Sequence, residues 1–192
     1  SEYVNKEMKK IEVNISDKII ICALKGLVPE TNLLFGEHMQ KHYNVSIDNF
    51  LVIGGPCHAE EVALEKLSYL TIGSSNLSLC KLISAKFKCK YINVKASDDV
   101  IGIEYASMLK NIFALAVGIS NGLGYGDNYQ SVLVSNSIKE MKRFISKRHK
   151  IKRNINNSAY LGDLLVTGYS SFSRNRMFGN MIGKGYTVRA AQ

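Results

Sequence analysis

Asn49-Phe-Leu-Val-Ile-Gly54 is the stretch that decides the predicted fold, because it is a short apolar run that Gly54-Gly-Pro56 ends abruptly. Runs of this kind are typical of strands buried in parallel sheets. Similar apolar runs are found before it at residues 17–24 and after it at residues 69–73 and 90–94. Helical spacing is found at residues 7–12, at 31–42 with Thr31 as the expected cap, at 58–66 and at 76–87. The alternation of strand and helix up to residue 97 predicts an α/β layer.

The spacing of apolar residues changes after Ser97, and no convincing strand is found beyond that residue. Asp98 and Asp99 suit the start of a long helix that reaches about residue 121. A second long helix is expected over about residues 128–147, and shorter ones near residues 160 and 173, the last ended by glycines 183 and 185. The predicted fold class is therefore α/β followed by all-α, with domains at residues 1–97 and 98–192.

Composition limits the classes of protein that fit. The chain has 192 residues, 46% of them apolar, and only two prolines, which suits globular units with real cores. No apolar run reaches the roughly 20 residues of a membrane span, and no secretory signal is visible. None of the four cysteines pairs as Cys-x-x-Cys, so no metal site is expected. Reduced thiols in the cytoplasm are the simple interpretation.

The net charge of +9 is concentrated in the segment Lys139–Arg153, which holds eight basic residues. A nucleic-acid-binding surface is one interpretation of this segment. A solvated helix face and loop is the other interpretation, and it is the favoured one. Gly122-x-Gly-x-Gly126 resembles a dinucleotide-binding loop, but it follows a helix instead of a strand, so a helix–helix turn is predicted.

Two lysines are candidates for chemistry. Lys110 lies in a helix that is apolar on nearly every side, which predicts a central helix. A desolvated lysine has a lowered pKa and can exchange a proton near neutral pH, whereas the alternative is an ammonium that reaches the surface. Lys25 ends the first strand, and ligands of open α/β sheets bind beyond the carboxyl ends of strands. An ordinary strand-end lysine remains the alternative there.

Three further segments could contact an anion or a polyol. Gly54-Gly-Pro-Cys-His-Ala59 follows a strand and opens a helix, where backbone N–H groups bind anions. Asp163 and Thr167 are four residues apart and share a helix face. Ser173-Arg-Asn-Arg176 stands at a predicted helix start and suits a phosphate dianion, with a capping serine and solvated arginines as the alternative.

Taken together, these segments resemble the NAD(P)-dependent sn-glycerol-3-phosphate dehydrogenase family, over about residues 18–192. The resemblance rests on seven motifs in order: Ala23-Leu-Lys-Gly26, Gly54-Gly-Pro-Cys-His-Ala59, Asp98-Asp-Val-Ile-Gly-Ile-Glu104, Leu109-Lys-Asn111, Asn121-Gly-Leu-Gly-Tyr-Gly-Asp127, Leu161-Gly-Asp-Leu164 and Ser173-Arg-Asn-Arg176. It implies the later part of a Rossmann domain joined to a helical substrate domain. It also implies reversible hydride transfer between NAD or NADP and dihydroxyacetone phosphate, giving glycerol 3-phosphate for phospholipid synthesis.

The resemblance also implies roles for single residues. Lys110 would exchange the proton of the carbinol oxygen, Lys25 would polarise the carbonyl, and Asp163 would orient Lys110 or hold a substrate hydroxyl. Lys25, Ala59 and Arg174 would contact the cofactor. The substrate-binding set would be Lys25, Gly55, Cys57, Lys110, Asn111, Asp163, Thr167, Ser173, Arg174 and Asn175. A small phosphorylated substrate is the expected partner, and a homodimer is possible. No nucleic-acid partner and no membrane span are expected.

Two departures from the family pattern stand out. Gly54 and Cys57 occupy positions where many relatives carry serine-like residues. The glycine-rich strand–turn–helix that would cradle the pyrophosphate is absent from the sequence, so the chain is expected to be a fragment that is inactive by itself. A related Rossmann dehydrogenase acting on a 2-hydroxy acid or sugar acid, and a basic nucleic-acid-binding module, are the alternative functions.

Overall fold

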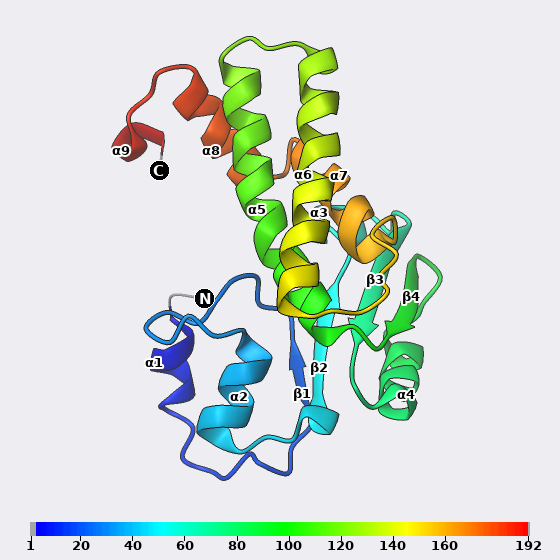
Figure 1. Cartoon of the computed structure of the whole chain (residues 1–192). Coiled ribbons are helices and arrows are strands. Elements are labelled where there is room, and N and C mark those ends of the chain that lie inside the picture. The colour runs from blue at the N-terminus through cyan, green and yellow to red at the C-terminus, as the bar shows by residue number, and fades with distance from the viewer. Residues whose placement is uncertain (1–2, 192) are drawn as a thin grey trace. The chain divides into compact units, whose positions relative to one another are not determined.

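A computed structural model describes residues 3–191 of the chain, and these form two compact units (Figure 1). The first unit extends to Met108 and the second begins at Leu109. The boundary falls inside one helix, α5 (Val100–Gly122), which therefore contributes residues to both units.

The first unit is built on a four-stranded sheet with the order β1-β2-β3-β4. The strands are β1 (Ile20–Cys22), β2 (Phe50–Gly54), β3 (Ser68–Gly73) and β4 (Ile92–Ser97). β1 and β2 are parallel, as are β3 and β4, but β2 and β3 are antiparallel. Four strands were expected at these places, and their alternation with helices confirms the α/β class. β4 begins and ends later than the predicted residues 90–94.

One hydrophobic cluster of the sheet gathers around Leu51 of β2, Ile72 of β3 and Cys80, all fully buried. Cys80 belongs to α4 (Leu77–Phe87), which covers β3 and β4 (Figure 1). Asn76 caps this helix by accepting the N–H of Leu79 at 3.1 Å. The other helices of the unit are α1 (Val4–Met8), α2 (Phe35–Tyr43), the 3-10 turn η1 (Ile47–Asn49) and α3 (Ala59–Ala63).

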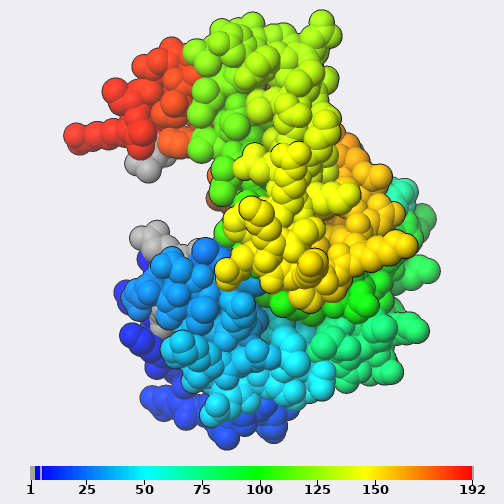
Figure 2. All heavy atoms as spheres, viewed as in Figure 1, coloured from blue at the N-terminus to red at the C-terminus, as the bar shows by residue number. Residues whose placement is uncertain are grey.

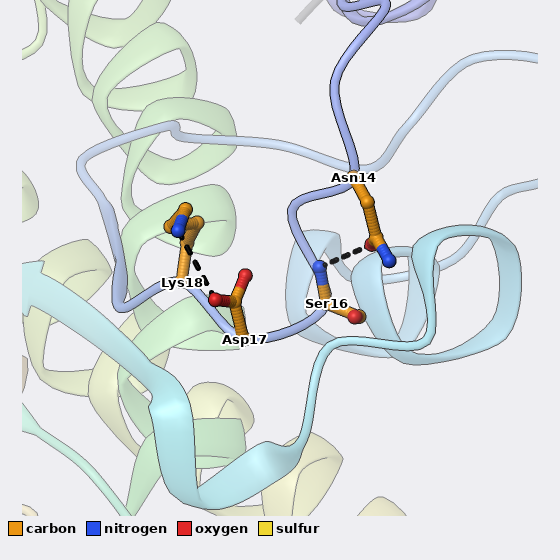
Figure 3. A network of polar contacts seen from close by, with 4 residues as sticks. All are labelled: Asn14, Ser16, Asp17 and Lys18. Carbon is orange, nitrogen blue, oxygen red and sulfur yellow. Dashed lines mark hydrogen bonds and ion pairs between the residues drawn. The ribbon is translucent and has the colours of Figure 1, made fainter.

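The first strand is shorter and less buried than the sequence predicted. Residues 14–18 form a turn in which Asn14 Oδ1 accepts the N–H of Ser16 at 2.9 Å and Lys18 pairs with Asp17 at 3.1 Å (Figure 3). The Lys18 ammonium lowers the pKa of Asp17. Because this turn occupies the residues before Ile20, the strand is only three residues long. Cys22 alone of its residues is fully buried, since β1 is at the edge of the sheet.

The start of α2 also differs from the prediction of a helix capped by Thr31. Glu30 and Asn32 both have positive φ angles, 72° and 53°, which no α-helix can contain. The chain therefore makes a tight loop first, and α2 begins at Phe35. Glu104 of α5 accepts the N–H of Gly36 at 3.1 Å and so satisfies one of the N–H groups that a helix start leaves unpaired.

Glu104 is almost fully buried among these contacts. Its desolvation raises the pKa of its carboxyl group to about 7. The backbone N–H bonds of Gly36 and Phe35 lower this pKa and the nearby Glu37 raises it, each to a smaller extent than desolvation. The motif Asp98–Glu104 was recognised from the sequence, but this function of Glu104 was not. Asp99 behaves as expected at the start of α5, because its carboxylate accepts the N–H of Gly102 at 3.0 Å.

Residues 109–191 form helices joined by turns and loops, with no strand among them, which confirms the all-α prediction for that part of the chain. A short turn connects α5 to α6, so the glycines of residues 122–126 do form a helix–helix turn. After α5, the helices are α6 (Asp127–Arg148), the π-helix η2 (Ser158–Gly162), α7 (Asp163–Tyr169), α8 (Arg174–Gly183) and α9 (Val188–Ala191). Neither the π-helix nor α9 was predicted.

α5 and α8 pack backbone to backbone through glycines. A Cβ atom placed on Gly118 or Gly122 of α5 would collide with the backbone of α8, and one on Gly179 or Gly183 of α8 would collide with α5. Spacing of four residues puts each pair of glycines on one helix face, so the two backbones can approach closely. The side-chain amide of Asn180 donates to Asn121 Oδ1 at 2.5 Å and fixes the register of the crossing.

α5 is long and apolar enough to cross a membrane by length and composition, but 67% of its most apolar stretch is buried inside the protein, as in a core helix.

The basic segment Lys139–Arg153 lies at the surface (Figure 2). The opposite stripe of α6 is buried through Val134, Met141 and Ile145, so the lysines occupy the solvated face of an amphipathic helix.

Candidate active site

An ion pair between Lys110 of α5 and Asp163 of α7 is the central feature of the second unit. The two side chains are only 4% and 3% exposed. The structure therefore rejects the alternative in which the ammonium of Lys110 reaches the surface. Burying two charges costs several kcal/mol per ion and is offset only by close pairing and further hydrogen bonds. A charge pair kept in the interior at that cost is a candidate for chemistry.

The chain around Asp163 departs from regular helical geometry. The π-helix η2 ends where α7 begins, and the N–H of Asp163 points back to carbonyl groups of Ser158 and Tyr160. π-helical turns are rare, and they are frequent at functional sites because they redirect one side chain out of a regular register. Thr167 lies one turn further on and donates its hydroxyl to the Asp163 carbonyl at 2.6 Å, so both residues do lie on one buried face of α7.

The start of α8 carries the predicted anion-binding residues. Ser173 is buried and caps the helix by accepting the N–H of Arg176 at 3.3 Å, which confirms the capping serine, whereas Arg176 is half-buried and not fully solvated. Arg174 and Asn175 are exposed in the first turn, where backbone N–H groups and the helix dipole attract anions. The first turn of α8 crosses α5 at Gly118, eight residues after Lys110, a rise of roughly 12 Å along the helix axis.

Asn111 follows Lys110 on α5 and is half-buried. Within the second unit, the structure thus brings Lys110, Asp163 and Thr167 together. It places the first turn of α8 along the same helix, α5.

The remaining predicted residues belong to the first unit and share one edge of its sheet. β1 and β2 are parallel, and Cys22 is paired with Val52, so Lys25 and Gly55 both lie three residues beyond a matched pair. Lys25 is exposed. Gly55 has φ 110°, and a Cβ atom there would lie 2.7 Å from the Tyr69 carbonyl oxygen, so only glycine fits this turn.

Cys57 and Ala59 follow the turn at Gly55. Cys57 is half-buried, and Ala59 is an exposed residue at the first position of α3. α3 has only five residues, so the helix-start anion site that the sequence suggested here is reduced to the turn itself. The two groups of predicted residues therefore belong to different units, one beyond β1 and β2 and one on α5, α7 and α8.

Comparison with known proteins agrees with this arrangement. The family model described as NAD-dependent glycerol-3-phosphate dehydrogenase N-terminus matches residues 1–80, and the one described as the C-terminus of the same enzyme matches residues 99–192. The chain belongs to the NAD-dependent glycerol-3-phosphate dehydrogenase family. Within the family pattern, Lys110, Asp163 and Arg174 all fall in the part matched by the C-terminal model.

Individual relatives extend this result. The glycerol-3-phosphate dehydrogenase [NAD(P)+] of Listeria monocytogenes serotype 4b is 39% identical over 168 residues, covering 87% of this chain and 50% of the relative. That of Oceanobacillus iheyensis is 36% identical, covering 88% and 49%. The crystal structure of glycerol-3-phosphate dehydrogenase from Coxiella burnetii superposes with a TM-score of 0.84 at 33% identity, covering 90% of this chain and 52% of that one. The chain thus spans about half the length of the curated relatives that it matches.

Lys25 and the turn at Gly55 stand beyond the carboxyl ends of adjacent parallel strands, the place where α/β sheets bind ligands. Within residues 3–191, however, no strand is followed by a glycine-rich phosphate-binding turn of the dinucleotide type, and the glycines of residues 122–126 join two helices. The pyrophosphate half of the cofactor therefore has no cradle in this part of the chain.

Proposed function

We propose that this chain carries the substrate-binding and proton-transfer part of a glycerol-3-phosphate dehydrogenase that uses NAD or NADP. The observation that carries the proposal is the buried ion pair of Lys110 with Asp163 in the family's C-terminal region. The proposed reaction reduces dihydroxyacetone phosphate to sn-glycerol 3-phosphate. The cofactor supplies or accepts the hydride, and the protein supplies orientation and proton transfer.

Lys110 is the proposed proton donor in the reducing direction. Its ammonium gives a proton to the substrate's carbonyl oxygen as that oxygen gains charge, and in the oxidising direction the neutral amine takes the proton back. Asp163 holds the Lys110 amine in one orientation and compensates its buried charge. Thr167 fixes the backbone of Asp163 from the same face of α7.

The phosphate is assigned to the start of α8, where Ser173, Arg174 and Asn175 lie. The guanidinium of Arg174 suits a phosphate dianion because it offers several N–H donors in one plane. Lys25, Gly55, Cys57 and Ala59 are proposed to meet the cofactor and the carbonyl end of the substrate. We also propose a cytoplasmic enzyme, and we retain the homodimer as a prediction.

The proposal is tested in a full-length enzyme that contains this sequence. Lys110→Met should remove most of kcat while leaving the binding of sn-glycerol 3-phosphate measurable, because methionine keeps the volume of the side chain but has no proton to transfer. Thr187→Ala, at an exposed position, is the matched control and should keep normal turnover. Near-normal kcat in Lys110→Met would reject the proton-transfer role.

Substrate choice is tested separately. Arg174→Ala should raise KM for dihydroxyacetone phosphate strongly and change kcat less, since a charge-assisted phosphate contact is lost. The same variant should not affect the KM of dihydroxyacetone, which lacks the phosphate. An enzyme that preferred a 2-hydroxy acid over the phosphorylated substrate would instead support the related-dehydrogenase alternative.

A further inference from the structure

A cavity of about 460 Å³ in the first unit has none of the proposed catalytic residues in its lining. It is formed between the N-terminal segment, the loop before α2 and α2 itself. Its polar lining comes from Lys9, Glu30, Thr31, His38, His42 and Tyr43. The sequence assigned no binding or catalytic function to any of these residues.

His38 is the unusual member of this lining. Its side chain is 96% buried, with a relative exposure of 4%, yet neither ring nitrogen has a hydrogen-bond partner among the described residues. Buried polar atoms are nearly always paired, and leaving one unpaired costs about 1–3 kcal/mol. A buried imidazole with two unpaired nitrogens at the wall of a cavity therefore points to a partner that the polypeptide itself does not supply.

His42 is the second feature of the same wall. It follows His38 by four residues on α2, so the two rings share one face of the helix, and their centres are 4.6 Å apart. Two imidazoles that bind one metal ion through Zn–N bonds of about 2.0–2.1 Å have their centres roughly 4.5–5 Å apart. A His-x3-His pair on a helix is also the arrangement that supplies two zinc ligands in metalloproteases.

The protonation state of His38 suits a metal ligand. Burial lowers the pKa of His38, and the neighbouring His42 lowers it further. Both effects favour the neutral ring, and a neutral imidazole offers a lone pair to a metal. Glu30 on the same cavity favours a bound cation, whereas Lys9 opposes it.

We propose that His38 and His42 chelate a divalent transition-metal ion of the zinc, nickel and copper class at this cavity. Among residues 3–191, no group of three histidine, cysteine or acidic side chains is placed to hold a metal, so water in the cavity completes the coordination shell. The site is distinct from the proposed dehydrogenase chemistry. It also departs from the expectation of no metal, which rested on cysteine spacing.

The test is calorimetric titration of the 192-residue chain with nickel chloride under reducing conditions. Cys57→Ser and Cys89→Ser are introduced first, because these are the two cysteines that are not fully buried and thiolates also bind the metal. We expect one nickel ion per chain. His42→Phe keeps an aromatic ring at an exposed position but removes the ligand, and it should raise Kd at least about tenfold.

Matched controls come from the chain itself, which has four histidines. His58→Phe and His149→Phe should leave the nickel Kd unchanged. Nickel should also raise the Tm of the parent chain but not that of His42→Phe, because a ligand that binds the native state stabilises it. No stoichiometric binding, or an equal loss of affinity in His149→Phe, would overturn the proposal and leave His38 as an aromatic filler. His38→Phe is a second variant with the same expected loss.

Discussion

Breaking the buried Lys110–Asp163 pair should cost far more than replacing it. The two side chains are 4% and 3% exposed, so Asp163→Ala leaves an ammonium in the interior without its carboxylate. Removing one partner of a buried pair typically costs about 3–5 kcal/mol, whereas replacing both by apolar residues is often neutral or stabilising. We therefore expect Asp163→Ala and Lys110→Met each to lose about 3–5 kcal/mol of unfolding free energy, and Lys110→Met/Asp163→Leu to lose much less than their sum.

The assay is urea unfolding at neutral pH, followed by circular dichroism, for the parent chain, both single variants and the double variant. The expected coupling energy is at least about 3 kcal/mol. Lys10 and Glu7 supply the internal control: their pair is 2.7 Å apart but is 61% and 59% exposed, so the same cycle should give less than about 1 kcal/mol. Additive effects of the Lys110 and Asp163 variants, within about 0.5 kcal/mol, would refute the reasoning.

Three further predictions concern packing, capping and pH. The pKa of Glu104 is raised to about 7 from its ordinary 4.5, so its contribution to stability is complete below about pH 4.5 and is lost as the pH rises through 7. Glu104→Gln should remove up to about 3 kcal/mol of this pH dependence of the unfolding free energy. The measurement is the urea midpoint of both proteins at pH 5 and pH 8. Gly118→Ala should destabilise by about 1–3 kcal/mol because its Cβ meets the α8 backbone, whereas Gly126→Ser, with nothing within 4 Å of its Cβ, should be nearly neutral in the same urea titrations. Ser173→Ala should cost about 1 kcal/mol through the lost helix cap, and a Ser173→Thr variant as unstable as Ser173→Ala would argue against capping.

The sequence predicted the elements whose signals are local. Short apolar runs located the four strands, and periodic apolar residues located α4, α5 and α6. The apolar helix around Lys110 was predicted, but its pattern left open whether the ammonium is buried or reaches the surface. The shared face of Asp163 and Thr167 followed from their spacing. The family motifs then connected these positions to one chemistry.

The features that were missed depend on contacts between distant residues or on backbone angles. Thr31 looked like a helix cap, but the positive φ angles of Glu30 and Asn32 delay α2, and the start of that helix is held by Glu104, 68 residues away from Gly36. The antiparallel pairing of β2 with β3 could not be predicted from the sequence. A short apolar run indicates a buried strand, but it does not indicate the direction of the neighbouring strand.

The close crossing of α5 with α8 has a consequence for how this part of the chain tolerates changes in length. Lys110 is held by Asp163, and Gly118 is held by the backbone of α8, so both ends of one helical segment are fixed by different partners. A single inserted or deleted residue between them would rotate one end by about 100° relative to the other and shift it by about 1.5 Å. Length variation should therefore be confined to connections such as residues 149–157, while the segment from 110 to 118 keeps its nine residues.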